Sequence, residues 1–438
     1  MSSNFNRREF LGMGALATAG LVVGVASCSD KKRTMPEYKF LDKAVDGKPL
    51  KAGLIGCGGR GTGAAKNFLE AGSNLTIHAL GDVFQDRLDN CRKNLKDGKN
   101  VEVADENCFL GFDAYEKVID SGVDVIILAT PPFFRPQQFA AAVNARKHVF
   151  MEKPVAVDPV GARSIIASSR KAETLGLVVG TGTQRRHQRN YLECWKEIYE
   201  GKIGEVIGAN VYWNQSQLWY RLPQKGMSEM EAMIRDWVNW TWLSGDHIVE
   251  QHVHNLDVAA WFSEKYPTKA VGFGSRHRRK TGDQFDNFSI DFEYDNGMHV
   301  HSMCRQIDGC DDNVSEFIMG TNGYSNCADT IYNSKGEEIW KYNYPLDEKG
   351  DIQWDKMVSS YVQEHIDLVT AIRKNEQYVE AEATAKSTLA AIMGRMSAYS
   401  GKIVTWDEVM NSDLKLGPAE LKFGDVDIPK SVAIPGIE

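Results

Sequence analysis

Short, nearly continuous apolar runs alternate with helical patterns along the first half of the chain. Such runs are typical of parallel strands buried on both faces of a sheet. Helical patterns over residues 133–146 and 159–175 separate the runs, which indicates right-handed βαβ units. The pattern therefore predicts one doubly wound α/β domain over residues 49–186. Its strands are expected in "KAGLIGC", "NLTIHALGD", "VDVIILATPP", "HVFMEKP" and "LGLVVGTGTQRR".

A different pattern starts after about residue 187. A helix is predicted over residues 191–200, and the runs that follow alternate between apolar and polar residues, as strands do. The sequence Asp-Asn-Gly at 295–297 is typical of a hairpin turn. Two more helices are expected near residues 361–374 and 380–400. Residues 187–438 should therefore form a second α/β domain with a mostly antiparallel sheet.

Length and composition agree with two globular domains. The chain has 438 residues, of which 42% are hydrophobic and 25% charged, and its formal net charge is −8. This mildly acidic chain has no dense Lys/Arg block, so no nucleic-acid partner is expected. Small, neutral molecules are the expected partners.

The first 28 residues have the pattern of an export signal. Arg7 and Arg8 precede a Gly/Ala-rich apolar run, which is typical of a twin-arginine signal and is too short for a lasting membrane span. The segment "VASC" is similar to a lipobox, which predicts a lipid on Cys28 and a membrane-anchored periplasmic protein. An ordinary signal with an incidental cysteine is the alternative. Residues 29–48 are polar and are expected to form a tether.

A glycine-rich turn follows the first predicted strand. Residues 56–61 fit the pattern G-x-G-x-x-G, in which glycines allow a tight turn and a close approach of the backbone to a pyrophosphate. Asp82 ends the second strand, where an acid hydrogen-bonds the ribose of NAD and repels the 2′-phosphate of NADP. A Rossmann domain that binds NAD rather than NADP is predicted, and Arg60 and Arg87 keep NADP as the alternative. The predicted cofactor residues are Gly56, Gly58, Gly59, Arg60, Gly61 and Asp82.

Lys153 ends the predicted strand "HVFMEKP" at the carboxyl edge of the sheet, where open α/β sheets bind their ligands. A lysine at this edge can hydrogen-bond a substrate oxygen and stabilise its negative charge as hydride departs. A solvated surface charge is the alternative interpretation.

The segment "VEQHVHNLD", residues 249–257, brings two acids and two histidines together. On one helix, Glu250, His254 and Asp257 would share a narrow face, and His252 would point to the opposite side. A metal site, a polar helix face and a proton-transfer site are the three interpretations. The chain has no Cys/His cluster at zinc spacing, so no metal is expected. Proton transfer by His254, oriented by Glu250, is favoured.

Four segments together resemble the Gfo/Idh/MocA oxidoreductases over about residues 50–400: "GLIGCGGRGTG", "ATPPFFRPQQFAAAVNARKHVFMEKP", "GTGTQRR" and "EQHVHNLDVAAWF". The resemblance implies that Lys153, Glu250 and His254 act on a substrate hydroxyl beside NAD(P). Glu250 stands where the family usually has Asp, which makes its role less certain than those of the other two residues.

The resemblance also has implications for the cofactor and for assembly. It implies that Thr130, Pro131, Glu152 and Lys153 lie beside the cofactor. It further implies a Rossmann domain followed by an α/β domain whose large open sheet often mediates oligomers. A homo-oligomer is therefore expected.

Five residues are candidates for substrate contacts. Gln184 and Arg185 follow the last strand of the first predicted sheet, with surface charge as the alternative for Arg185. Trp240 could stack on a sugar, although packing is common for such residues. Asp257 shares the predicted helix face with His254, and Tyr212 is a further acid/base candidate or a packing residue.

The expected function is NAD-dependent oxidation of a saccharide, glycoside or polyol hydroxyl. Because free NAD is not expected outside the cytoplasm, the cofactor should stay tightly bound and be recycled by a second substrate. Exported members of glycoside hydrolase family 109 offer an alternative, in which transient oxidation and elimination cleave a glycoside with His252 or a tyrosine as the extra base. A lipid-anchored sugar-binding protein without catalysis is the third hypothesis.

Overall fold

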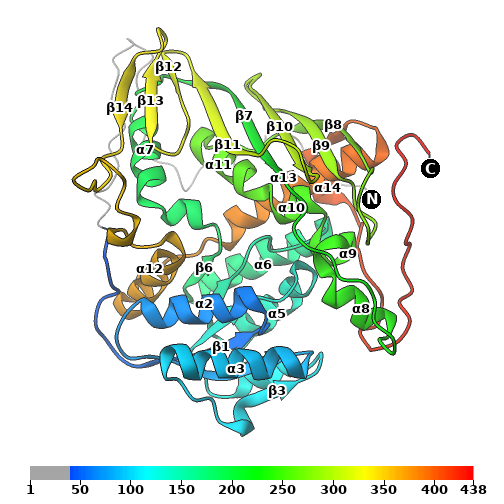
Figure 1. Cartoon of the computed structure of the whole chain (residues 1–438). Coiled ribbons are helices and arrows are strands. Elements are labelled where there is room, and N and C mark those ends of the chain that lie inside the picture. The colour runs from blue at the N-terminus through cyan, green and yellow to red at the C-terminus, as the bar shows by residue number, and fades with distance from the viewer. Residues whose placement is uncertain (1–39, 438) are drawn as a thin grey trace, which may run out of the picture. The chain divides into compact units, whose positions relative to one another are not determined.

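A computed structural model of the chain describes residues 40–437 (Figure 1). The predicted twin-arginine signal, Cys28 and the first part of the predicted tether lie outside the described residues. Among residues 40–437, no helix has both the length and the apolar composition needed to cross a membrane.

Six parallel strands form the first sheet in the order β3-β2-β1-β4-β5-β6. This is the Rossmann order, and it confirms the predicted doubly wound domain. Each predicted apolar run supplies one strand, and β3 is an additional short edge strand. The strands are β1 (Leu50–Ile55), β2 (Leu75–Asp82), β3 (Cys108–Leu110), β4 (Val125–Leu128), β5 (His148–Met151) and β6 (Val179–Thr181).

Helices cover both faces of this sheet. Ile127 of β4 packs into a core with one group of helices, whereas its neighbour Ile126 packs into a separate core on the other face. Both side chains are fully buried, which explains why the strands are apolar at consecutive positions. One face carries α2 (Gly59–Glu70), α3 (Gln85–Lys99) and α12 (Ser360–Lys374), and the other carries α4 (Ala114–Asp120), α5 (Arg135–Asn144) and α6 (Pro159–Thr174).

Helix α12 comes from the C-terminal part of the chain and nevertheless belongs to the core of the first sheet. Its residues Ile366 and Leu368 are fully buried in the same cluster as β1. Arg373 at the end of this helix donates a hydrogen bond to the carbonyl oxygen of Val45, 2.7 Å away. The last residues of the predicted tether therefore pack against the first domain, and that domain draws on residues far beyond 186.

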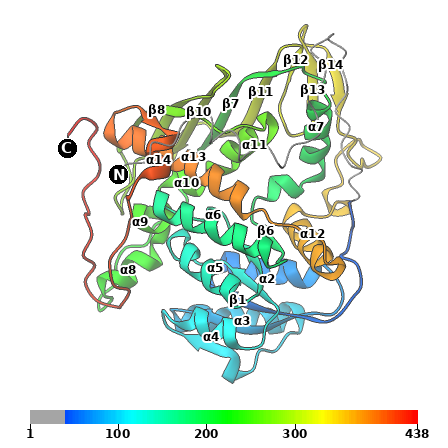
Figure 2. The ribbon, with the colours of Figure 1, turned by 180° about the vertical axis from the view of Figure 1, so that it is seen from behind.

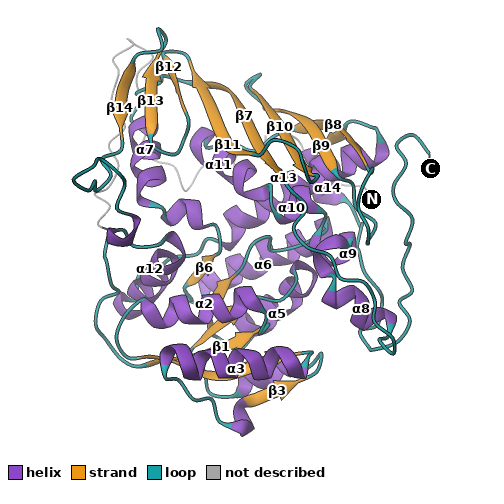
Figure 3. Cartoon of the chain, in the orientation of Figure 1, coloured by secondary structure: helices purple, strands orange, loops and turns teal. Residues whose placement is uncertain are grey.

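Nine strands form the second sheet in the order β14-β13-β12-β11-β7-β10-β9-β8-β15 (Figure 3). The pair β7–β10 is parallel and the other pairs are antiparallel, which confirms the predicted mostly antiparallel sheet. The strands are β7 (Val206–Gln215), β8 (Lys269–Ser275), β9 (Asn287–Glu293), β10 (His299–Gln306), β11 (Asn313–Gly320), β12 (Gly323–Ser325), β13 (Thr330–Asn333), β14 (Glu338–Lys341) and β15 (Val404–Thr405).

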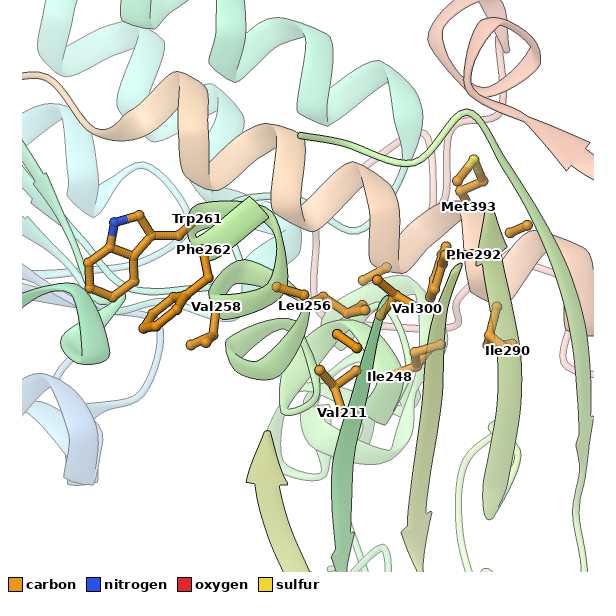
Figure 4. Close-up of a cluster of buried hydrophobic side chains, with 14 of the residues drawn as sticks. Val211, Ile248, Leu256, Val258, Trp261, Phe262, Ile290, Phe292, Val300 and Met393 are labelled. Atoms are coloured by element: carbon orange, nitrogen blue, oxygen red, sulfur yellow. The ribbon is translucent and has the colours of Figure 1, made fainter. Parts of the chain in front are cut away.

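Among residues 40–437, helices cover only one face of the second sheet (Figures 1 and 2). On the covered face, Val211, Ile290 and Phe292 of the sheet pack with residues of the helices in one large core (Figure 4). On the other face, the side chain of Phe273 is 73% exposed. The covering helices are α7 (Arg189–Tyr199), α10 (His247–Glu250), α11 (Val253–Ser263) and α13 (Ala381–Ser400).

Two segments extend the second domain beyond its sheet. Between β7 and α10 the chain forms α8 (Glu229–Arg235) and α9 (Thr241–Ser244). After α14 (Trp406–Asn411) the tail is irregular, and it runs alongside α8 in both views (Figures 1 and 2). Short 3₁₀ turns occur at Asp105–Asn107, Pro132–Phe134, Gln184–His187, Trp237–Asn239 and Trp354–Lys356.

Candidate active site

The glycine turn between β1 and α2 has the geometry that its sequence predicts. Gly56 has a φ of 95°, and a Cβ there would lie 2.7 Å from the backbone of Ala129 and Thr130. A Cβ at Gly61 would lie 1.8 Å from the carbonyl oxygen of Gly56, so only glycine allows the helix to approach the strand. Above Gly58 and Gly59, by contrast, an added Cβ would meet no atom within 4 Å.

This open space belongs to a cavity of about 400 Å³. The start of α2 faces it, and Gly58 caps that helix without a side-chain hydrogen bond, which leaves backbone N–H groups for an anion. The cavity therefore fits the pyrophosphate and adenosine of a dinucleotide. Eight predicted cofactor residues line it together: Gly56, Gly58, Gly59, Arg60, Gly61, Asp82, Thr130 and Pro131.

Asp82 lies at the end of β2, beside the glycine turn. One carboxylate oxygen accepts a hydrogen bond from the backbone N–H of Cys57 at 2.7 Å, and the other accepts from Phe84 at 2.9 Å. Burial raises the pKa of Asp82. The acid thus holds the glycine turn in place and presents its carboxylate to the cavity.

Arg60 reaches away from the glycine turn. Its guanidinium lies 2.5 Å from the carboxylate of Glu152 and packs over the ring of Tyr361. Glu152 is 4% exposed, and it precedes Lys153 just after the end of β5. The pair therefore joins the pyrophosphate end of the site to the carboxyl edge of β5.

Lys153 and Glu250 meet at this edge. The ammonium nitrogen of Lys153 lies 3.2 Å from Oε1 of Glu250 and also donates a hydrogen bond to the backbone carbonyl of Glu250. Their side chains are only 10% and 8% exposed. The structure thus places two of the three predicted catalytic residues in direct contact.

The helix predicted to carry Glu250, His254 and Asp257 on one face is interrupted. Glu250 ends α10, and α11 begins at Val253. At this break, the backbone N–H of His252 bonds to the carbonyl oxygen of His247. Glu250 and His254 therefore belong to different helices, and the turn between them sets their relative positions.

His254 is 6% exposed, and its Nδ1 has no hydrogen-bond partner among the described residues. Its ring stacks on Trp213 of β7, with ring centres 5.5 Å apart. Burial lowers the pKa of His254 well below its usual value, and the positive charge of Lys153 lowers it further. A neutral imidazole with an unpaired nitrogen near a lysine can accept a proton from a substrate hydroxyl.

His252 contacts the second sheet. It is fully buried, and its Nε2 lies 2.7 Å from the hydroxyl of Ser302 in β10. Burial lowers its pKa to about 3. Within residues 40–437, no group of three His, Cys, Asp or Glu side chains could hold a metal ion.

The predicted substrate residues lie in several places. Gln184 has a buried Oε1 without a hydrogen-bond partner among the described residues, which suits contact with a ligand. Arg185 pairs with Glu316 and lies over the ring of Trp213. Asp257 accepts two hydrogen bonds from Arg186, at 2.8 and 3.0 Å, and one from Ser387. Its oxygens are engaged inside the protein.

The positions of Tyr212 and Trp240 differ from those predicted. Tyr212 follows Val211, which is buried on the covered face of β7. Because side chains alternate along a strand, Tyr212 points to the open face, away from His254. Trp240 packs against the apolar cluster that contains Trp242 and Leu243, and it does not line the cavity. The structure therefore gives no contact of either residue with Lys153 or His254 among the described residues.

Sequence reasoning missed Trp213, which contacts the ring of His254. The alternation of Ala209, Val211 and Trp213 as the apolar positions of β7 was a usable signal, because it marks the face that packs on the core. Arg235 and Asp86, which lie at the adenosine end, gave no such signal because 149 residues separate them.

Comparisons with known proteins agree with this geometry. The family described as "Oxidoreductase family, NAD-binding Rossmann fold" matches residues 50–183, and the "GFO/IDH/MocA C-terminal domain" matches residues 191–325. The chain belongs to the Gfo/Idh/MocA family. Both domains of the chain match models of this family, and the match to the NAD-binding domain supports a nicotinamide dinucleotide as cofactor.

Individual relatives are more distant. The chain is 29% identical to a myo-inositol 2-dehydrogenase of Thermotoga maritima over 156 residues, 36% of this chain and 42% of the relative. It is 26% identical to an inositol 2-dehydrogenase of Salmonella typhimurium over 227 residues, which are 51% of this chain and 58% of the relative. The match thus spans about half the length of these relatives.

A solved structure has a similar fold. The scyllo-inositol dehydrogenase from Lactobacillus casei with bound NAD(H) and scyllo-inositol aligns with a TM-score of 0.61 and 20% identity. The alignment covers 82% of this chain and 99% of that structure. At this identity the likeness concerns the fold.

Proposed function

We propose that this protein is an NAD-dependent oxidoreductase that acts on a hydroxyl group of a saccharide, glycoside or polyol. The observations that carry the proposal are the Lys153–Glu250 pair, the buried His254 whose pKa the charge of Lys153 lowers, and a glycine-lined cavity at the start of α2. Relatives named as inositol dehydrogenases support the substrate class. A hydroxyl substrate fits a site that combines a neutral proton acceptor with a lysine.

Each residue of the site has a separate task in this proposal. His254 accepts the proton of the substrate hydroxyl, because its imidazole is held neutral by burial and by the charge of Lys153. Lys153 donates a hydrogen bond to the same oxygen and stabilises its negative charge. Glu250 positions Lys153 through side chain and backbone. The bound nicotinamide ring supplies the hydride acceptor.

The finer cofactor assignment is NAD, retained between turnovers. Asp82 presents a carboxylate at the end of β2, where it would hydrogen-bond ribose hydroxyls and repel a 2′-phosphate. Arg87 lines the same cavity, so comparison of NAD and NADP binding tests the preference directly. A second substrate would return the hydride to the retained cofactor.

Export and assembly complete the proposal. The twin-arginine pattern and the "VASC" segment support a periplasmic protein that is anchored by a lipid on Cys28. The open face of the second sheet supports a homo-oligomer, since Val271, Phe273 and Met303 expose apolar side chains there. A second copy of the chain would cover this face.

The absorbance band of reduced nicotinamide tests the activity. Purified protein is mixed with inositols, aldoses and aryl glycosides, first without added cofactor and then with NAD or NADP. We expect the band to appear with one class of hydroxyl compound and to disappear with a carbonyl compound. Release of an aglycone in heavy water, with deuterium at the adjacent carbon and no net cofactor change, would instead establish glycoside cleavage.

A further inference from the structure

The second domain supplies one wall of the dinucleotide cavity. We call residues 216–240 the strap; they leave the end of β7 and include α8. Trp219, Arg221, Ile234 and Trp237 of the strap line the cavity, opposite the glycine turn and Asp82. A dinucleotide on the glycine turn would therefore have the strap on its other side, although the strap belongs to a different domain.

Apolar packing holds the strap against the Rossmann domain. Phe84, which follows Asp82, is 8% exposed and shares one buried cluster with Met230, Met233 and Ile234 of the strap. Trp237 is packed against the same cluster. Because Phe84, Ile234 and Trp237 also line the cavity, the cavity is a gap inside this interdomain cluster.

An ion pair reinforces this contact. The guanidinium of Arg235, at the end of α8, binds both carboxylate oxygens of Asp86 at 2.9 and 3.2 Å. It also lies 3.9 Å from the centre of the Phe84 ring and 3.0 Å from Glu231. The hydrogen bonds from Arg235 lower the pKa of Asp86. Bidentate geometry and an aromatic face make this pair stronger than an ordinary surface ion pair.

The C-terminal tail adds a second layer over the strap. The N–H of Met230 donates to the carbonyl of Gly424 at 3.0 Å, and the N–H of Val426 donates to Glu229 at 2.8 Å. Phe423 of the tail contacts the rings of Phe84 and Phe112. Strap, tail and Rossmann domain thus meet at the adenosine end of the cavity.

We propose that the strap is a binding element for the adenosine half of the dinucleotide and that the Arg235–Asp86 pair keeps it closed over the bound cofactor. This inference rests on the proposed function. Release of the dinucleotide requires the strap to separate from Phe84 and Asp86, so the pair sets the rate at which cofactor leaves. The contact between Arg235 and Asp86 would then explain how an exported enzyme retains its cofactor.

The rate of dinucleotide release tests this proposal without any reference to catalysis. Wild-type protein and the variant Asp86→Asn are loaded with radiolabelled NAD and diluted into excess unlabelled NAD, and the label retained on the protein is followed with time. We expect release from the variant to be about twofold to fivefold faster, because loss of one partly exposed ion pair changes an equilibrium by roughly that factor.

Glu382→Gln is the matched control. Glu382 forms a bidentate pair with Arg170, at 2.9 and 3.1 Å, that does not involve the cavity lining. We expect its release rate to equal that of the wild type. Equal rates in the wild type and Asp86→Asn would overturn the role of the strap while leaving dinucleotide binding intact. If the purified wild type contained no dinucleotide and also bound neither labelled NAD nor labelled NADP, the proposed function itself would be overturned.

Discussion

Lys153 and Glu250 form an ion pair, with 3.2 Å between Nζ and Oε1, although 97 residues separate them in the chain. Lys153 also donates a hydrogen bond to the backbone carbonyl of Glu250. The pair joins the Rossmann domain to the helices of the second domain at the centre of the candidate site. The position of the lysine thus depends on both domains.

Substitution of Lys153 by Met should nearly abolish turnover. The methionine fills similar space and removes the hydrogen bond to the substrate oxygen, so we expect a loss of about 100-fold to 1000-fold in kcat. Glu250→Gln should cost only about tenfold, because the backbone carbonyl of Glu250 still holds the lysine. Steady-state kinetics with the best hydroxyl substrate measures both. A larger loss in Glu250→Gln than in Lys153→Met would contradict these roles.

Hydride transfer should stay active at mildly acidic pH. Burial and the charge of Lys153 hold the pKa of His254 well below its usual value of about 6.5. The imidazole therefore remains neutral and able to accept a proton until the pH falls through that lowered pKa. Stopped-flow measurement of nicotinamide reduction against pH checks the position of the acid limb. In the variant His254→Asn, the rapid phase of nicotinamide reduction should be lost. If this variant reduced the nicotinamide as fast as the wild type, His254 would have no part in the mechanism.

His187 should stabilise the fold in a pH-dependent way. Burial alone would lower its pKa, but Glu380, 3.2 Å away, and Asp367, 2.7 Å away, raise the pKa well above its usual value. Its charged form therefore stabilises the protein below the unfolded pKa of about 6.5, and this contribution is lost as pH rises through the raised pKa. We expect His187→Gln to lower the free energy of unfolding by about 3 kcal/mol at about pH 6, with the difference shrinking toward pH 10.

Urea unfolding across that pH range measures the effect. The exposed His277 provides the control, since His277→Gln removes an imidazole without breaking a buried pair. That variant should change stability by less than about 0.5 kcal/mol throughout. If His187→Gln lowered the free energy of unfolding by the same amount at every pH, the packing of His187 and not its charge would be the source of the stabilisation.

The open face of the second sheet should set the oligomeric state. Phe273→Glu puts a charge on the most exposed apolar side chain of that face, which should dissociate the oligomer because a buried unpaired charge opposes association. Sedimentation velocity compares the variant with the wild type. Leu110→Glu, at the edge strand of the first sheet, alters an exposed apolar residue elsewhere and should leave the assembly unchanged. An intact oligomer in Phe273→Glu would exclude this face as the contact.

Local features of the site were predictable from the sequence. The glycine turn, Asp82 and Lys153 each lie at or just beyond the carboxyl end of a strand, and parallel strands bring these ends to one edge of a sheet. The long-range features were not. Tyr212 and Trp213 are neighbours, and although alternation along β7 assigns Trp213 to the packed face, only the tertiary structure brings His254 to that face. A shift of one residue exchanges the two faces of a strand.

The sequence by itself determined the two domain types and the dinucleotide turn, and it supplied the candidates for proton transfer, because these depend on spacing along short segments. The tertiary structure alone decided that α12 completes the first core, that the helix of His254 begins only after Glu250, and that the strap meets Asp86. The first and the last of these arise from packing between segments more than a hundred residues apart. Such contacts leave no periodic pattern in either partner.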